Sequence, residues 1–154
     1  MSSPSPDLRE YEVHARTTDT FGRVLCGCRT LHFVADGPVQ NQCPGEAITP
    51  PELFLSGVAA CGIELLQVIA KERGIPLETA RVSISGVIDR SRPVRTDLSL
   101  FNSVRLKFRL AGVTRAQGEE IVGAFQKRCP IYGTVRAATP EVLVEIEIDG
   151  EGRR

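Results

Sequence analysis

The segment that most constrains the fold of this chain covers residues 49–73, where the pattern predicts one long apolar helix. The run Thr49-Pro50-Pro51-Glu52 is a start signal. Threonine can cap a helix, proline suits the first helical position, and a glutamate three residues after the cap completes a capping box. Gly74 and Pro76 follow the apolar run. Because both residues stop helices, we predict a helix that ends at about residue 73.

This helix is apolar on most of its sides. One stripe of apolar residues recurs at spacings of four, three, four and three, and consists of Phe54, Val58, Cys61, Leu65 and Val68. A second set of apolar residues widens the stripe, namely Leu55, Ala59, Leu66 and Ile69. A helix that is apolar almost all round is buried on most sides. In a chain of 154 residues, we expect a second subunit to supply part of that cover, which predicts a homodimer.

The same segment bears on membrane insertion. Its longest uncharged stretch, residues 53–63, ends at Glu64. This stretch is shorter than the roughly 20 residues that a bilayer core requires, so we predict no membrane span.

Composition restricts the class of protein further. Lys plus Arg and Asp plus Glu both number 19, which gives zero net charge and argues against a nucleic-acid partner. The start of the chain, MSSPSPD, lacks the basic and apolar regions of a secretory signal, so we expect a cytoplasmic protein with mostly reduced cysteines. We predict one domain over residues 9–149, with tails at residues 1–8 and 150–154.

Alternating apolar and polar residues predict the strands. They cover residues 10–16, two pieces at 23–28 and 30–35 with a break near Gly27, and then 81–88, 104–110 and 141–149. A capping box at residues 114–117 opens a second helix that stops before Pro130. The basic face of 104–110 and the acidic face of 141–149 would pair well as neighbours in one sheet. The order β-β-β-α-β-β-α-β indicates an α+β fold with helices on a mostly antiparallel sheet.

Several polar residues invite a functional interpretation that the sequence does not support. Cys26 and Cys28 share one side of a strand, but a structural zinc needs four ligands. Cys43, His14 and His32 could complete the set only by chance of folding, so we predict no metal. Three arginines at 90, 92 and 95 are interpreted as part of a solvated loop.

Two further cysteines remain, Cys61 inside the first helix and Cys129 at the end of the second. Periodicity allows two interpretations for both. They are small thiols of the core, or they are reactive groups. Spacing alone does not choose between these interpretations.

The residues around these cysteines resemble a known family. The run from Pro51 to Cys61, PELFLSGVAAC, is similar to the central-helix motif of the OsmC/Ohr family, and RCPIY at 128–132 resembles its second motif. The cysteines are 68 positions apart, and the resemblance extends over residues 10–148. It implies an OsmC-like fold in an intertwined homodimer, with two sites at the subunit interface.

The resemblance also implies an activity, that of a thiol peroxidase acting on organic hydroperoxides in oxidative-stress defence. Cys61 is then the peroxidatic residue, which becomes a sulfenic acid, and Cys129 is the resolving residue, which forms a disulfide with it. An external dithiol reduces that disulfide, and no bound cofactor is implied.

One position departs from the family pattern. The family's peroxidases have a glutamate ten residues before the first cysteine, where this chain has Pro51. Glu52 lies one residue later, which is about 100° around the helix, and its capping role explains it without catalysis. The family's arginine corresponds best to Arg23, with Arg16 and Arg29 as alternatives. The rival interpretation is a non-catalytic protein that binds an apolar small molecule at the dimer interface, with structural or sensory thiols.

Overall fold

The computed structural model describes residues 8–150 of the chain. Residues up to Leu53 and from Phe54 onward form two compact units, here called unit 1 and unit 2. Most of the predicted tails, residues 1–7 and 151–154, lie outside the described residues.

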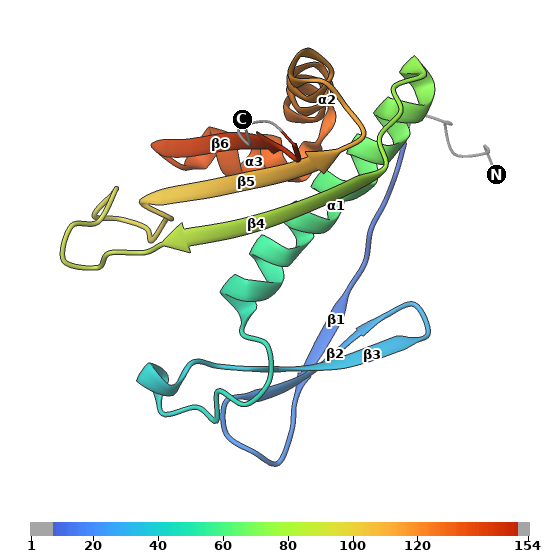
Figure 1. Ribbon diagram of the computed structural model, residues 1–154. Helices are drawn as coiled ribbons and strands as arrows, with labels where there is room; N and C mark the ends of the chain where they lie inside the picture. Colours follow the sequence, from blue (N-terminus) through green and yellow to red (C-terminus); the bar gives the residue numbers. More distant parts are fainter. Residues whose placement is uncertain (1–7, 151–154) are drawn as a thin grey trace. The chain divides into compact units, whose positions relative to one another are not determined.

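Unit 1 is an antiparallel meander of three strands, β1 (His14–Thr17), β2 (Arg23–Cys28) and β3 (Leu31–Asp36), with β2 in the centre (Figure 1). A short 3-10 helix, η1 (Val39–Asn41), follows in the loop after β3. The predicted strand at 23–28 is confirmed, and the predicted strand at 30–35 is shifted by one residue.

Two details of the predicted meander are wrong. Strand β1 begins at His14, which pairs with Gly27, rather than at residue 10, because β2 ends at Cys28, one residue beyond that pair. The break between the second and third strands lies at Arg29, which adopts a left-handed φ of 55°. Gly27, where the break was predicted, pairs with both His14 and His32 inside the sheet.

The meander has two different faces, because opposed residues in an antiparallel pair share a face. What we call the apolar face of unit 1 carries Ala15, Val24, Cys26, Cys28, Leu31 and Phe33. The opposite face carries His14, Arg16, His32 and the pair Arg23–Asp36, together with the apolar residues Leu25 and Val34.

The long apolar helix, α1, spans Pro50–Arg73, as predicted. Its first residues belong to unit 1, and the remainder lies in unit 2. The backbone N–H and the hydroxyl of Thr49 both donate to the Glu52 carboxylate, at 2.7 and 2.6 Å. The predicted helix-capping contact of Glu52 is therefore present.

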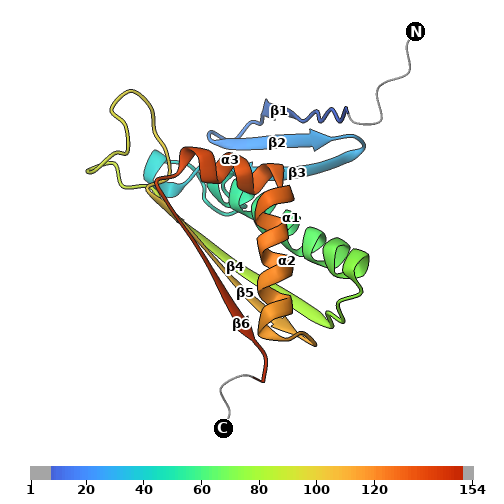
Figure 2. The same ribbon diagram turned by 90° about the horizontal axis from the view of Figure 1, so that it is seen from above.

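Unit 2 contains the second sheet, in the order β4 (Thr79–Val87), β5 (Ser103–Ala111) and β6 (Glu141–Ile148). Its helices are the rest of α1, then α2 (Arg115–Arg128) and α3 (Pro130–Ala138). All three lie on one side of the sheet (Figure 2). Within residues 8–150 the fold is thus α+β with two three-stranded sheets and three α-helices, which confirms the predicted class.

The prediction that these two strands are neighbours in one sheet is confirmed, since all of β6 pairs with residues 103–110 of β5. Ion pairs connect their exposed faces, with Arg109 lying 3.1 Å from Glu147 and 3.6 Å from Asp149. The pairing is parallel, however, so the sheet is mixed rather than antiparallel. A side-chain alternation does not encode strand direction, because it has the same period in both kinds of pair.

Helix α3 was not predicted. Pro130 was interpreted only as the end of the second helix, but it occupies the first turn of a new helix, where its fixed φ is favourable. The capping box that opens α2 is confirmed, because Thr114 and Gln117 exchange both of its hydrogen bonds.

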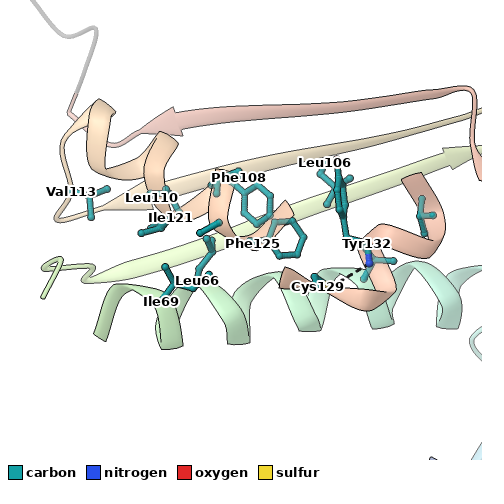
Figure 3. Close-up of a cluster of buried hydrophobic side chains, with 14 of the residues drawn as sticks. Leu66, Ile69, Leu106, Phe108, Leu110, Val113, Ile121, Phe125, Cys129 and Tyr132 are labelled. Carbon is teal, nitrogen blue, oxygen red and sulfur yellow. Dashed lines mark hydrogen bonds between the residues drawn. The ribbon is translucent and has the colours of Figure 1, made fainter. Parts of the chain in front are cut away.

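The core of unit 2 lies between the sheet and its helices (Figure 3). Phe125 of α2 stands between α1 and β5, and it contacts the ring of Phe108 edge to face with centroids 5.5 Å apart. Leu66 and Ile69 of α1 are fully buried in the same cluster.

Helix α1 is long and apolar enough, by length and composition, to cross a bilayer. The prediction of no membrane span considered only the uncharged stretch of residues 53–63, whereas the apolar character of α1 continues beyond Glu64. Core helices can have the same length and composition, and α1 places Val58, Leu66 and Ile69 in the core of unit 2.

Candidate active site

The candidate site is built around the two cysteines of unit 2, whose sulfur atoms lie 2.8 Å apart. Both are free thiols, since a covalent disulfide would be about 2.05 Å long. Cys61 comes from the middle of α1, and Cys129 comes from the junction between α2 and α3. The fold therefore joins two thiols that are 68 positions apart in the chain.

A glycine allows the two elements to approach closely. Gly62, next to Cys61, is buried, and a methyl group added there would lie 3.3 Å from the Phe108 ring and 3.7 Å from the Phe125 ring. The absence of a side chain at Gly62 thus allows α1 to pack closely against Phe108 and Phe125. Sequence reasoning did not identify this role of Gly62, although a glycine beside a candidate nucleophile was a visible signal.

Cys129 is fixed by the two helices that meet at it. Its backbone N–H donates to the Phe125 carbonyl at 2.9 Å and ends α2, and its carbonyl accepts from Gly133 N–H at 2.9 Å in α3. Its sulfur also accepts a hydrogen bond from the Tyr132 backbone N–H at 3.3 Å, shown as the dashed line in Figure 3. Cys129 is therefore the N-cap of α3, and its sulfur has a fixed direction.

Tyr132 supports this junction with its side chain. Its ring packs against Phe125 with centroids 5.2 Å apart, and its hydroxyl accepts a hydrogen bond from Gln126 at 2.9 Å. The neighbouring Arg128 pairs with Glu72 and so joins the end of α2 to the end of α1. These contacts position Cys129 opposite Cys61.

The surroundings of Cys61 favour its neutral thiol. Burial, the hydrogen bond with Cys129, and the charges of Cys129 and Glu64 raise the pKa of Cys61 to about 12. Burial is the largest of these causes, because it removes water from the thiolate. The neutral thiol of Cys61 is therefore favoured over its thiolate.

Arg23, the predicted partner of the Cys61 thiolate, lies in unit 1. Its guanidinium donates two hydrogen bonds of 2.8 Å to the buried Asp36 and a third, of 2.7 Å, to Glu46. These contacts raise the pKa of Arg23 and keep it charged. Sequence reasoning did not identify Asp36 or Glu46, which are distant from Arg23 in the chain. The role of Arg23 toward Cys61 stays a prediction, as does any catalytic role of Glu52.

The remaining cysteines and histidines lie apart from one another. Cys26 and Cys28 are on the apolar face of unit 1, whereas His14 and His32 flank Gly27 on the opposite face. Cys43 packs directly against Gly22 and Gly37. Among residues 8–150, no three His, Cys, Asp or Glu side chains are grouped so that they could hold a metal ion.

Comparison with known proteins identifies the family. The model of the OsmC family, described as OsmC-like protein, matches residues 43–145, which include both cysteines. The chain belongs to the OsmC-like family. A comparison with curated proteins finds no matching sequence.

Solved structures of the family have the same fold. The OsmC-like protein from Mycoplasma pneumoniae is 17% identical, with a TM-score of 0.78, over 91% of this chain and 97% of its own. An organic hydroperoxide resistance protein from Legionella pneumophila is 21% identical, with a TM-score of 0.72 and coverages of 91% and 98%. A putative organic hydroperoxide resistance protein from Vibrio cholerae is 23% identical, with a TM-score of 0.70 and coverages of 91% and 95%.

Proposed function

We propose that this protein is a thiol-dependent peroxidase that reduces organic hydroperoxides in oxidative-stress defence. The observation that carries the proposal is the 2.8 Å separation between the sulfur atoms of Cys61 and Cys129. At this distance, oxidation of one sulfur is followed by a disulfide with the other without a large movement of the backbone.

The reaction consists of two displacements. The Cys61 thiolate attacks one oxygen of the hydroperoxide, the O–O bond breaks, and the other oxygen leaves with a proton as the alcohol. Cys61 is then a sulfenic acid. The thiol of Cys129 attacks this sulfur, releases water, and forms the disulfide. An external dithiol supplies the two electrons that return the disulfide to two thiols.

The reaction requires a positive charge near Cys61, because burial, Cys129 and Glu64 all favour the thiol over the attacking thiolate. Arg23 is the proposed source, since an arginine stays charged and can hold both a thiolate and a peroxide oxygen. Asp36 and Glu46 orient its guanidinium within unit 1.

We also propose a homodimer in the cytoplasm. The apolar face of unit 1 leaves Leu31 60% exposed and Phe33 38% exposed, and a second copy of the chain would cover them. A reducing compartment suits an enzyme whose catalytic pair must be returned to thiols after each turnover.

Some structural neighbours support a small-molecule site in this fold. The neighbour from Legionella pneumophila is an organic hydroperoxide resistance protein, and the putative one from Vibrio cholerae has a molecule of captopril bound in one of its active sites. At identities of 21% and 23%, these neighbours support the choice of activity without fixing the substrate.

One observation favours a second candidate function. The raised pKa of Cys61, about 12, describes a thiol that is protonated at neutral pH. A non-catalytic protein that binds an apolar small molecule at the dimer interface would need no thiolate, and its thiols would be structural or sensory.

The experiment that separates the two functions measures consumption of cumene hydroperoxide in the presence of a dithiol. Cys61→Ser should abolish consumption, and Cys129→Ser should lose repeated turnover. Cys43→Ser is the matched control, since it removes a thiol in unit 1, and it should keep wild-type activity. Equal rates in the wild type and Cys61→Ser would leave the binding function as the better account.

A further inference from the structure

The two sulfur atoms of the candidate site differ in their accessibility. Cys129 is 3% exposed and belongs to the buried cluster of unit 2. Cys61 is half-buried and lies at the edge of that cluster. A thiolate that attacks a disulfide between them therefore has better access to the sulfur of Cys61.

The two atoms also differ in how well they can hold a negative charge. The sulfur of Cys129 accepts the Tyr132 N–H at 3.3 Å at the start of α3, where unpaired backbone N–H groups concentrate positive charge. Cys61 lies in the middle of α1, where backbone N–H groups are already used within the helix, and the charge of Glu64 acts against its thiolate.

Both differences favour one direction of disulfide exchange. The rate of this reaction depends on access to the attacked sulfur and on how well the departing sulfur carries charge. The sulfur of Cys129 is buried and caps a helix, whereas the sulfur of Cys61 beside it is accessible. We therefore propose that the reductant attacks the Cys61 sulfur of the disulfide and that Cys129 is the leaving group. This inference rests on the proposed function and adds which sulfur receives the reductant.

Reduction of the disulfide takes two exchange steps. A thiolate of the reductant forms a bond to the Cys61 sulfur, the Cys61–Cys129 bond breaks, and its electron pair leaves on Cys129 as a thiolate that accepts the Tyr132 N–H. The second thiol of the reductant then loses its proton and attacks the reductant's own sulfur in the mixed disulfide. Cys61 is released and both protein sulfurs end as thiols, while the dithiol becomes a disulfide.

The test is a trapping experiment with glutathione. The protein is oxidised with diamide, which forms the disulfide without any peroxidase activity, and the Cys61–Cys129 bond is verified by peptide mapping. The oxidised protein is then mixed rapidly with excess glutathione and quenched with acid, which protonates thiolates and stops exchange. Mapping of early time points should place glutathione on Cys61 in about tenfold excess over Cys129.

A matched pair of variants tests the helix terminus itself. Ile131 is an exposed residue in the first turn of α3, between Pro130 and Tyr132. Ile131→Asp places a negative charge beside the departing sulfur, whereas Ile131→Asn has nearly the same shape without charge. Glutathione should attack the Asp variant about threefold more slowly than the Asn variant.

Failure of this inference and failure of the proposed peroxidase function give different experimental results. Glutathione found mainly on Cys129, or equally on both cysteines, would overturn the inference, and so would equal rates for the two Ile131 variants. A diamide-oxidised protein that traps glutathione on Cys61 but consumes no hydroperoxide would retain the inference and reject the peroxidase.

Discussion

Arg23 donates two parallel hydrogen bonds of 2.8 Å to Asp36, a carboxylate that is fully buried. The backbone N–H groups of Glu46 and Ala47 donate to the same carboxylate at 3.0 Å. These hydrogen bonds connect β2, β3 and the loop after η1 within unit 1.

The first prediction concerns this buried carboxylate. Asp36→Asn should lower the midpoint of thermal unfolding several times more than Asp97→Asn, because it leaves Arg23 without its buried counter-charge. Asp97 is the matched control, since it also binds an arginine through two hydrogen bonds but is exposed. Equal shifts in the two variants would contradict the structural role of Asp36.

The pH dependence of stability has a definite sign. Hydrogen bonds from Arg23 and from the loop N–H groups lower the pKa of Asp36 below its unfolded value. The folded state thus gains stability from Asp36 above pH ~4, and this contribution is lost as the pH falls below that value. Urea denaturation from pH 6 downward should show a steeper loss for the wild type than for Asp36→Asn.

The Arg23–Asp36 contact also shows where sequence reasoning stops. Helix α1 and the opening of α2 were predictable because caps and stops are local, as the contact of Thr49 with Glu52 illustrates. The cluster of Arg23, Asp36 and Glu46 could not be predicted in this way, because it depends on how a loop folds back on a strand.

In the candidate site, too, some features could be predicted from the sequence and others could not. Periodicity placed Cys61 on the apolar stripe of α1 but left its role open, and only the family resemblance paired it with Cys129. Helix α3 was missed because Pro130 both ends one helix and begins the next. The hydrogen bond from Tyr132 to the Cys129 sulfur follows from α3 and could not be predicted without it.

The second prediction uses two glycines of α1. Gly57→Ala should raise the free energy of unfolding by about 0.5–1 kcal/mol, because nothing lies within 4 Å of the added methyl group and alanine favours a helix. Gly62→Ala should gain less than this or lose stability, because its methyl group would press on the Phe108 ring at 3.3 Å. Urea denaturation of both variants measures the difference, and an equal gain would argue against close packing at Gly62.

The third prediction concerns the proposed dimer. Phe33→Glu places a charge on the apolar face of unit 1 and should convert a dimer at micromolar concentration into monomers. His32→Glu introduces the same charge on the opposite face one residue away, and it should leave the dimer intact. Sedimentation velocity measures both variants. A wild-type monomer at this concentration, or dissociation by both changes, would reject the proposed interface.

The fourth prediction concerns the ionisation of Cys61. Because Cys129 contributes to the raised pKa of Cys61, removal of its thiol in Cys129→Ser should lower that pKa. Cys61 of the reduced variant should then react faster with iodoacetamide at pH 7.5 than Cys61 of the wild type, as followed by peptide mapping. An unchanged rate would mean that Cys129 does not control the protonation of Cys61.

The intact mass of the reduced protein after one equivalent of an alkyl hydroperoxide tests the redox pairing of Cys61 with Cys129 most directly. The wild type should lose two hydrogen atoms as the disulfide forms, and mapping should locate the bond between Cys61 and Cys129. Cys129→Ser should instead gain one oxygen on Cys61, and Cys61→Ser should keep its mass. A wild-type protein whose mass does not change, or a Cys61→Ser variant that is oxidised as readily, would contradict the account.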